Sequence, residues 1–67
     1  MVTSGNDLWG RAHVLTLQGY EAFRAVDLDL AKDLHSTAHG LAVELGDRAA
    51  QAENLLALAH IHLVRDE

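Results

Sequence analysis

The chain has 67 residues and a formal net charge of −5, so it forms at most one domain and lacks the clustered lysine and arginine of a nucleic-acid-binding surface. It contains no cysteine, which excludes disulfides and thiolate zinc sites as sources of stability. A domain this small buries only about 60% of the surface that its unfolded chain exposes. We therefore expect one domain, residues 1–67, that gains stability by forming a homo-oligomer.

The segment from Met1 to Asp7 is polar and has no basic stretch followed by an apolar run. A secretory signal or a membrane span would require such a run. We therefore expect a cytoplasmic protein whose partners include neither a membrane nor a nucleic acid.

The first predicted helix covers residues 6–25, with Asn6 or Asp7 as a possible cap. Its apolar and small residues recur at helical spacing. They are Leu8, Ala12, Leu15, Gly19, Ala22, Phe23 and Val26. Gly19 interrupts this helix at a cost of about 1 kcal/mol relative to alanine. A glycine in such a place often lets another backbone approach closely, although plain tolerance explains many cases.

The second predicted helix covers residues 28–45. It follows Asp27, whose carboxylate can accept from the free amides of the first turn. Its apolar face consists of Leu30, Ala31, Leu34, Ala38, Leu41, Ala42 and Leu45. Gly46 lies where a left-handed residue would end the helix, and Asp47 is placed to cap the next one. This is the clearest boundary in the sequence.

The third predicted helix covers residues 48–65 and has apolar residues on more than one side. One face carries Ala49, Ala52, Leu55, Leu56, Ala59 and Leu63, and the apolar surface is widened by Leu58, Ile61 and Val64. A helix that is apolar on two sides needs two packing partners. We expect the first two helices to cover one side, and Leu58, Ile61 and Val64 to pack against another copy.

The order of small residues resembles a tetratricopeptide repeat. Gly19, Asp27, Ala31 and Ala38 occupy the close-packing and turn positions of that family, and residues 44–48 resemble the junction between repeats. The chain departs from the family pattern where Leu15 replaces a tryptophan and Ala22 a tyrosine. Asp27 and Asp66 also lie farther apart than the usual period of about 34 residues.

This resemblance implies an all-α fold of about one and a half repeats, made of a helical hairpin plus one helix. It also implies that a partner protein or helix binds the exposed face of the first helix, through His13, Thr16, Tyr20 and Arg24. A generic three-helix bundle would produce the same pattern of small residues and stays open. The alternative that Tyr20 only covers the edge of the core, while Arg24 is solvated, also stays open.

Five histidines are the unusual feature of the composition. His35 and His39 lie four residues apart, the spacing that places two imidazoles on one helical face, and are weak candidates for zinc or nickel ligands. A tetrahedral site would need further ligands from elsewhere, and solvated surface histidines are the simpler interpretation. We expect no cofactor.

No nucleophile motif, phosphate-binding loop or catalytic pair of carboxylates is present, so we do not expect an enzyme. The main functional hypothesis is a protein–protein interaction module of tetratricopeptide-like type that also self-associates. The alternative is a helical bundle that binds a metal or a small ligand through His35 and His39.

Overall fold

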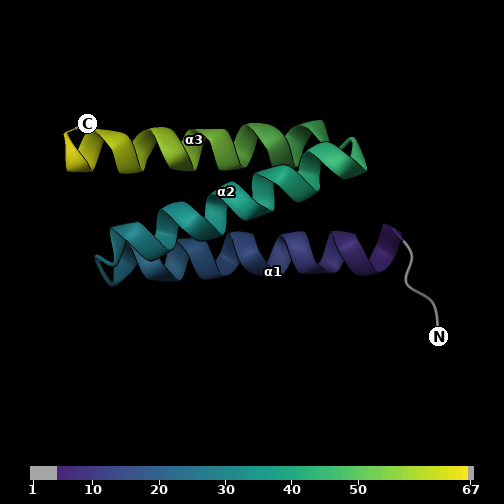
Figure 1. Ribbon diagram of the computed structural model, residues 1–67, viewed down its shortest axis with the longest axis horizontal. Helices are drawn as coiled ribbons and strands as arrows, with labels where there is room; N and C mark the ends of the chain where they lie inside the picture. The colour runs from purple at the N-terminus through teal and green to yellow at the C-terminus, as the bar shows by residue number, and fades with distance from the viewer. Residues whose placement is uncertain (1–4, 67) are drawn as a thin grey trace.

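The computed structural model describes residues 5–66, and these form three helices without any strand (Figure 1). The helices are α1 (Gly5–Arg24), α2 (Leu28–Leu45) and α3 (Arg48–Arg65). The predicted all-α class and the helix-turn-helix-turn-helix order are therefore confirmed. In Figure 1, α1 and α3 run in the same direction and α2 runs back between them.

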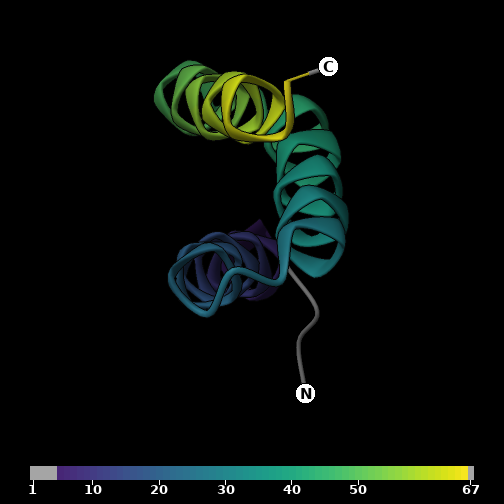
Figure 2. The same cartoon turned by 90° about the vertical axis from the view of Figure 1, so that its left-hand side faces the viewer.

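The end-on view shows that α1 and α3 lie on the same side of α2 (Figure 2). α2 packs against both of its neighbours in the chain. α1 and α3 meet through side chains that reach across the space between them, as described below. The three helices therefore form an open arrangement around α2.

The boundary between α2 and α3 is the one predicted. Gly46 has φ of +69°, and its amide and that of Asp47 donate to the carbonyls of Val43 and Ala42, at 3.1 and 2.9 Å. The Asp47 carboxylate accepts from the amide of Ala50 at 3.1 Å, which starts α3. Asp27 starts α2 in the same way, by accepting from Leu30 at 3.3 Å.

Both ends of α1 differ from the prediction. The helix begins at Gly5, so Asn6 and Asp7 lie inside its first turn and neither is the N-cap. Val26 lies beyond its end, is 73% exposed and has φ of +62°. The amides of Val26 and Asp27 donate to the carbonyls of Phe23 and Ala22, both at 2.9 Å, so Val26 has the same place in its turn that Gly46 has after α2, directly before the cap of the next helix. The periodicity assigned Val26 to the buried face because it takes no account of this left-handed turn.

The core consists mainly of alanine. The buried apolar residues are Ala12, Ala22, Ala31, Ala38, Ala42, Ala57 and Ile61. Phe23, Leu28, Leu34 and Leu58 are partly buried around the cluster that Ala22, Ala31 and Ile61 form. Leu30, predicted on the apolar face of α2, is exposed instead. Small side chains allow the helices to approach closely, as expected for this composition.

The predicted orientation of α3 is wrong. Its face toward α2 carries Asn54, Ala57 and Ile61, and Ile61 is 0% exposed within the single chain. Ile61 is therefore not free to contact another copy, whereas Leu58 is partly buried beside it and Val64 is exposed. Two apolar sides are present, as predicted. The prediction chose the wrong side as the inner one, because Asn54 makes the true inner face look less apolar in the sequence.

Candidate functional site

The face of α1 that was predicted to bind a partner is turned toward α3, with one exception. His13 lies at the surface there, Thr16 is buried, and Tyr20 is 37% exposed. Arg24 is exposed and pairs with Glu21 on its own helix, at 3.5 Å. The prediction that Thr16 is exposed is therefore wrong, because α3 covers it.

Asn54 of α3 is the centre of a buried polar network that joins all three helices. Its Oδ1 atom accepts from Nδ1 of His35 on α2, at 2.8 Å. Its amide nitrogen donates to the Thr16 hydroxyl at 3.2 Å and to the carbonyl of Ala50 at 2.9 Å. The Thr16 hydroxyl in turn donates to the carbonyl of Ala12, at 2.9 Å. The network therefore fixes how α3 sits on α1 and α2.

His35 is buried, so the interpretation of His35 and His39 as solvated residues is wrong for His35. Because the amide oxygen of Asn54 can only accept, His35 carries its proton on Nδ1 in this bond. The Tyr20 and His35 rings pack edge to face, with centroids 5.0 Å apart and planes at 63°. The metal-binding alternative loses support because His35 faces the core. Within residues 5–66, no group of three histidine or carboxylate side chains could hold a metal ion.

Tyr20 forms a second bridge between α1 and α3. Its hydroxyl donates to Oε2 of Glu53 at 2.9 Å. The pKa of Tyr20 is raised to about 12, chiefly by partial burial and also by the hydrogen bond to Glu53 and the negative charge of this carboxylate. Glu53 is thereby held at the edge of a cavity between the helices.

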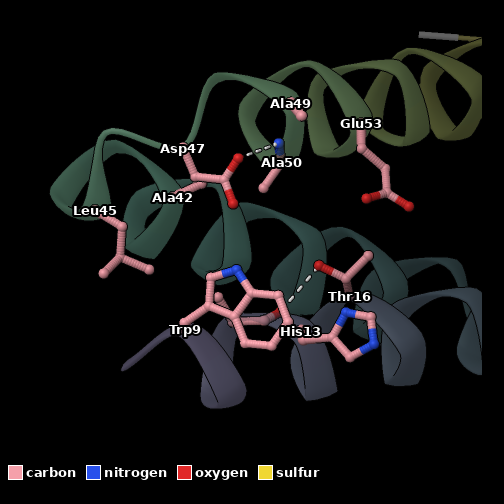
Figure 3. Close-up of a pocket in the computed structure, with 10 residues that line it drawn as sticks. Trp9, His13, Thr16, Ala42, Leu45, Asp47, Ala49, Ala50 and Glu53 are labelled. Carbon is pink, nitrogen blue, oxygen red and sulfur yellow. Dashed lines mark hydrogen bonds between the residues drawn. The ribbon is translucent and has the colours of Figure 1, made fainter. Parts of the chain in front are cut away.

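This cavity has a volume of about 170 Å³ and lies between the first half of α1 and the start of α3 (Figure 3). It is lined by Trp9, Ala12, His13, Thr16, Ala42, Leu45, Asp47, Ala49, Ala50 and Glu53. Trp9 is 55% exposed and stacks on His13, with ring centroids 5.6 Å apart and planes 2° from parallel. An aromatic wall on α1 therefore faces a wall on α3 that carries two carboxylates.

A second candidate surface is the side of α3 that points away from α2. Five residues at alternating spacings of three and four share it, namely Ala49, Ala52, Leu56, Ala59 and Leu63. All five are exposed, Leu56 by 65% and Leu63 by 76%. We call these five residues the outer stripe of α3.

Sequence reasoning missed three residues of the site: Trp9, Glu53 and Asn54. Trp9 precedes His13 by four residues, so helical spacing could have placed the only tryptophan of the chain on the same face. Asn54 follows Asp47, the cap of α3, by two helical turns, which could have placed it on the inner side of the helix. No local signal identifies its partners, because Thr16 and His35 lie far from it in the sequence.

The fold and the site thus define an all-helical chain with a polar network at its centre and two surfaces suited to binding. No family model matches the chain, and no curated protein or solved structure matches it. None of the helices within residues 5–66 is long and apolar enough to cross a membrane.

Proposed function

We propose that the chain is a helical protein–protein interaction module that associates with a second copy of itself through the outer stripe of α3. The observation that carries the proposal is the exposure of Leu56 and Leu63 in a heptad-like row whose other members are alanine. Covering one such leucine contributes up to about 1.5–3 kcal/mol, a large share of what a core of this size supplies.

The row is self-complementary in an antiparallel helix pair. In that arrangement Leu56 of each copy lies opposite Ala59 of the other, and Leu63 lies opposite Ala52. Each large side chain thus meets a small one in every layer, which allows close packing of the two helices. A parallel pair would place leucine against leucine and alanine against alanine, leaving alternate layers too wide and too narrow.

The repeat-like character of the module is part of the same proposal. It is supported by the direction of α3, which runs parallel to α1 on one side of α2 (Figure 1). Membership of the tetratricopeptide repeat family stays a prediction from the residues that carry the resemblance. The same holds for the cytoplasmic location and for the absence of catalytic activity.

The proposal is tested by the mass of the protein in solution, measured by light scattering at tens of micromolar. We expect two chains, and one chain for Leu56→Glu with unchanged helical content, because Leu56 is exposed in the single chain. Leu17→Glu is the matched control, since Leu17 is a half-exposed leucine on α1. We expect this variant to stay a dimer.

A mass of one chain for the unchanged protein would refute the proposal. A mass of one chain for Leu17→Glu, with Leu56→Glu still a dimer, would place the interface on α1. Ile61→Asp does not test the interface, because Ile61 is in the core and a buried charge there would unfold the single chain.

A further inference from the structure

We propose that the cavity between α1 and the start of α3 binds the guanidinium group of an arginine side chain on a partner polypeptide. This goes beyond self-association, which uses the outer stripe of α3; the two surfaces have Ala49 alone in common. The proposal depends on three features of the cavity: its size, its charge and its aromatic wall.

The size of the cavity suits one side chain. Its volume of about 170 Å³ is close to the roughly 150 Å³ that holds a benzene-sized molecule in a protein interior. Sites for drug-sized ligands and cofactors start at about 300 Å³. The occupant is therefore a group of a few atoms. Because Trp9, which lines the cavity, is 55% exposed, the cavity lies at the surface, where a polypeptide can approach.

The charge of the cavity selects a cation. Asp47 and Glu53 both line it, and no lysine or arginine does. Asp47 accepts from the amide of Ala50 through Oδ1, and Glu53 accepts from Tyr20 through Oε2, so each carboxylate keeps one oxygen for another donor. Neither carboxylate forms an ion pair among residues 5–66. Figure 3 shows both on the α3 side of the cavity, above Trp9 and His13 on α1.

The aromatic wall selects arginine over lysine. A guanidinium group is planar, stacks on aromatic faces and donates several hydrogen bonds in fixed directions, whereas an ammonium is a compact charge. The stack between Trp9 and His13 holds the indole in one orientation. A guanidinium that lies along the indole can then donate to the free oxygens of Asp47 and Glu53.

The experiment uses the fluorescence of Trp9, the only tryptophan of the chain. The full chain is titrated with acetyl-Gly-Arg-Gly-amide, with the same peptide carrying citrulline, which is neutral and of similar shape, and with a lysine peptide. We expect a saturable change with the arginine peptide that weakens at high salt. The citrulline peptide should bind at least about tenfold more weakly, since it offers no charged hydrogen bond.

The variants separate the cavity from the net charge of the protein. Asp47→Asn keeps a capping side chain, and Glu53→Gln keeps an acceptor for Tyr20, so both should fold and bind the arginine peptide about tenfold more weakly. Asp33→Asn removes the same charge from an exposed site on α2 and should bind like the unchanged protein. The single-chain variant Leu56→Glu should also bind normally.

Equal binding of the arginine and citrulline peptides, or no saturable change, would overturn the proposal. So would an equal loss in Asp33→Asn, because attraction by net charge alone would then explain the binding. Equal binding of the lysine peptide would overturn the assignment to guanidinium. Normal binding by a chain that proves monomeric would leave this site in place while refuting the proposed self-association.

Discussion

Gly19 of α1 and His35 of α2 lie against each other at the centre of the helical hairpin. A Cβ atom built on Gly19 would be 2.5 Å from Nε2 and 2.7 Å from Cδ2 of the His35 ring. The ring has no room to move away, because it is buried and its Nδ1 atom is bonded to Asn54. The glycine therefore makes space for a side chain rather than for a second backbone.

We predict that Gly19→Ala lowers the free energy of unfolding. Overpacking costs about 1–3 kcal/mol, and the better helix propensity of alanine returns about 1 kcal/mol of it. A net loss of 1 kcal/mol corresponds to roughly 4–8 °C in Tm for a domain of this size. Gly40→Ala is the control, since a Cβ there meets no atom within 4 Å, and should raise Tm. Stabilisation by both substitutions would contradict the packing described for His35.

Asn54→Ala should be among the most destabilising substitutions in α3. It leaves the buried Nδ1 of His35 without an acceptor and removes a donor to Thr16, at a cost of roughly 2–4 kcal/mol in chemical denaturation. Gln51→Ala provides the comparison, because Gln51 is only partly buried and donates to the Ala42 carbonyl at 3.4 Å. Similar losses in the two variants would show that the network adds little to stability.

The turn after α1 should be improved by replacing Val26. A β-branched residue with φ of +62° is strained, at a cost of about 1–2 kcal/mol relative to a right-handed conformation. Asparagine tolerates this conformation, so Val26→Asn should raise Tm by several degrees. The reverse substitution at the equivalent position, Gly46→Val, should lower Tm. No change in either variant would show that these turns relax at little cost.

Tyr20 should titrate with a pKa near 12, which the ultraviolet absorbance of the only tyrosine reports directly. Its ordinary pKa is 10.0, and the folded value is raised, so the folded chain holds the proton more tightly than the unfolded chain. The resulting stability is present below pH 10 and is lost as the pH rises from about 10 to 12. Glu53→Gln should lower the pKa but leave it above 10, since burial is the largest cause. An unchanged pKa in this variant would contradict the bridge.

Single cysteines can report the direction of the helices in the proposed dimer, because the chain has none of its own. In the antiparallel pair, a mixture of Ala52→Cys and Leu63→Cys chains should form the mixed disulfide between the two variants. A parallel pair would instead link Ala52→Cys chains to one another. Mass spectrometry of the oxidised mixture distinguishes the two results, and a predominance of the self-linked product would refute the antiparallel arrangement.

The helices could be predicted from the sequence because their ends have local causes. Asp27 and Asp47 cap the helices that follow them, and Gly46 adopts the left-handed conformation that ends α2. Val26 could not be predicted to do the same, because a β-branched residue rarely adopts this conformation. The hydrogen bonds of the turn accompany this conformation, from the Val26 amide to the Phe23 carbonyl and from the Asp27 amide to the Ala22 carbonyl, both at 2.9 Å.

The orientation of α3 and the site could be predicted only in part. His13 and Tyr20 were predicted to be exposed on α1 from the resemblance to the repeat family, and both are exposed. The burial of Thr16 and His35 depends on Asn54, which reaches them only in the folded chain. Because a polar residue on an inner face is stable only when such partners are present, its burial could not be predicted from α3 alone.

The position of α2 between its two neighbours also bears on how the chain folds. Each of the large helix–helix contacts joins elements that follow one another in the sequence. Only short loops must close to form them, and chains dominated by such local contacts fold in microseconds to milliseconds. We therefore expect the hairpin of α1 and α2 to form by closing one short loop, and α3 to dock on the surface that this hairpin presents.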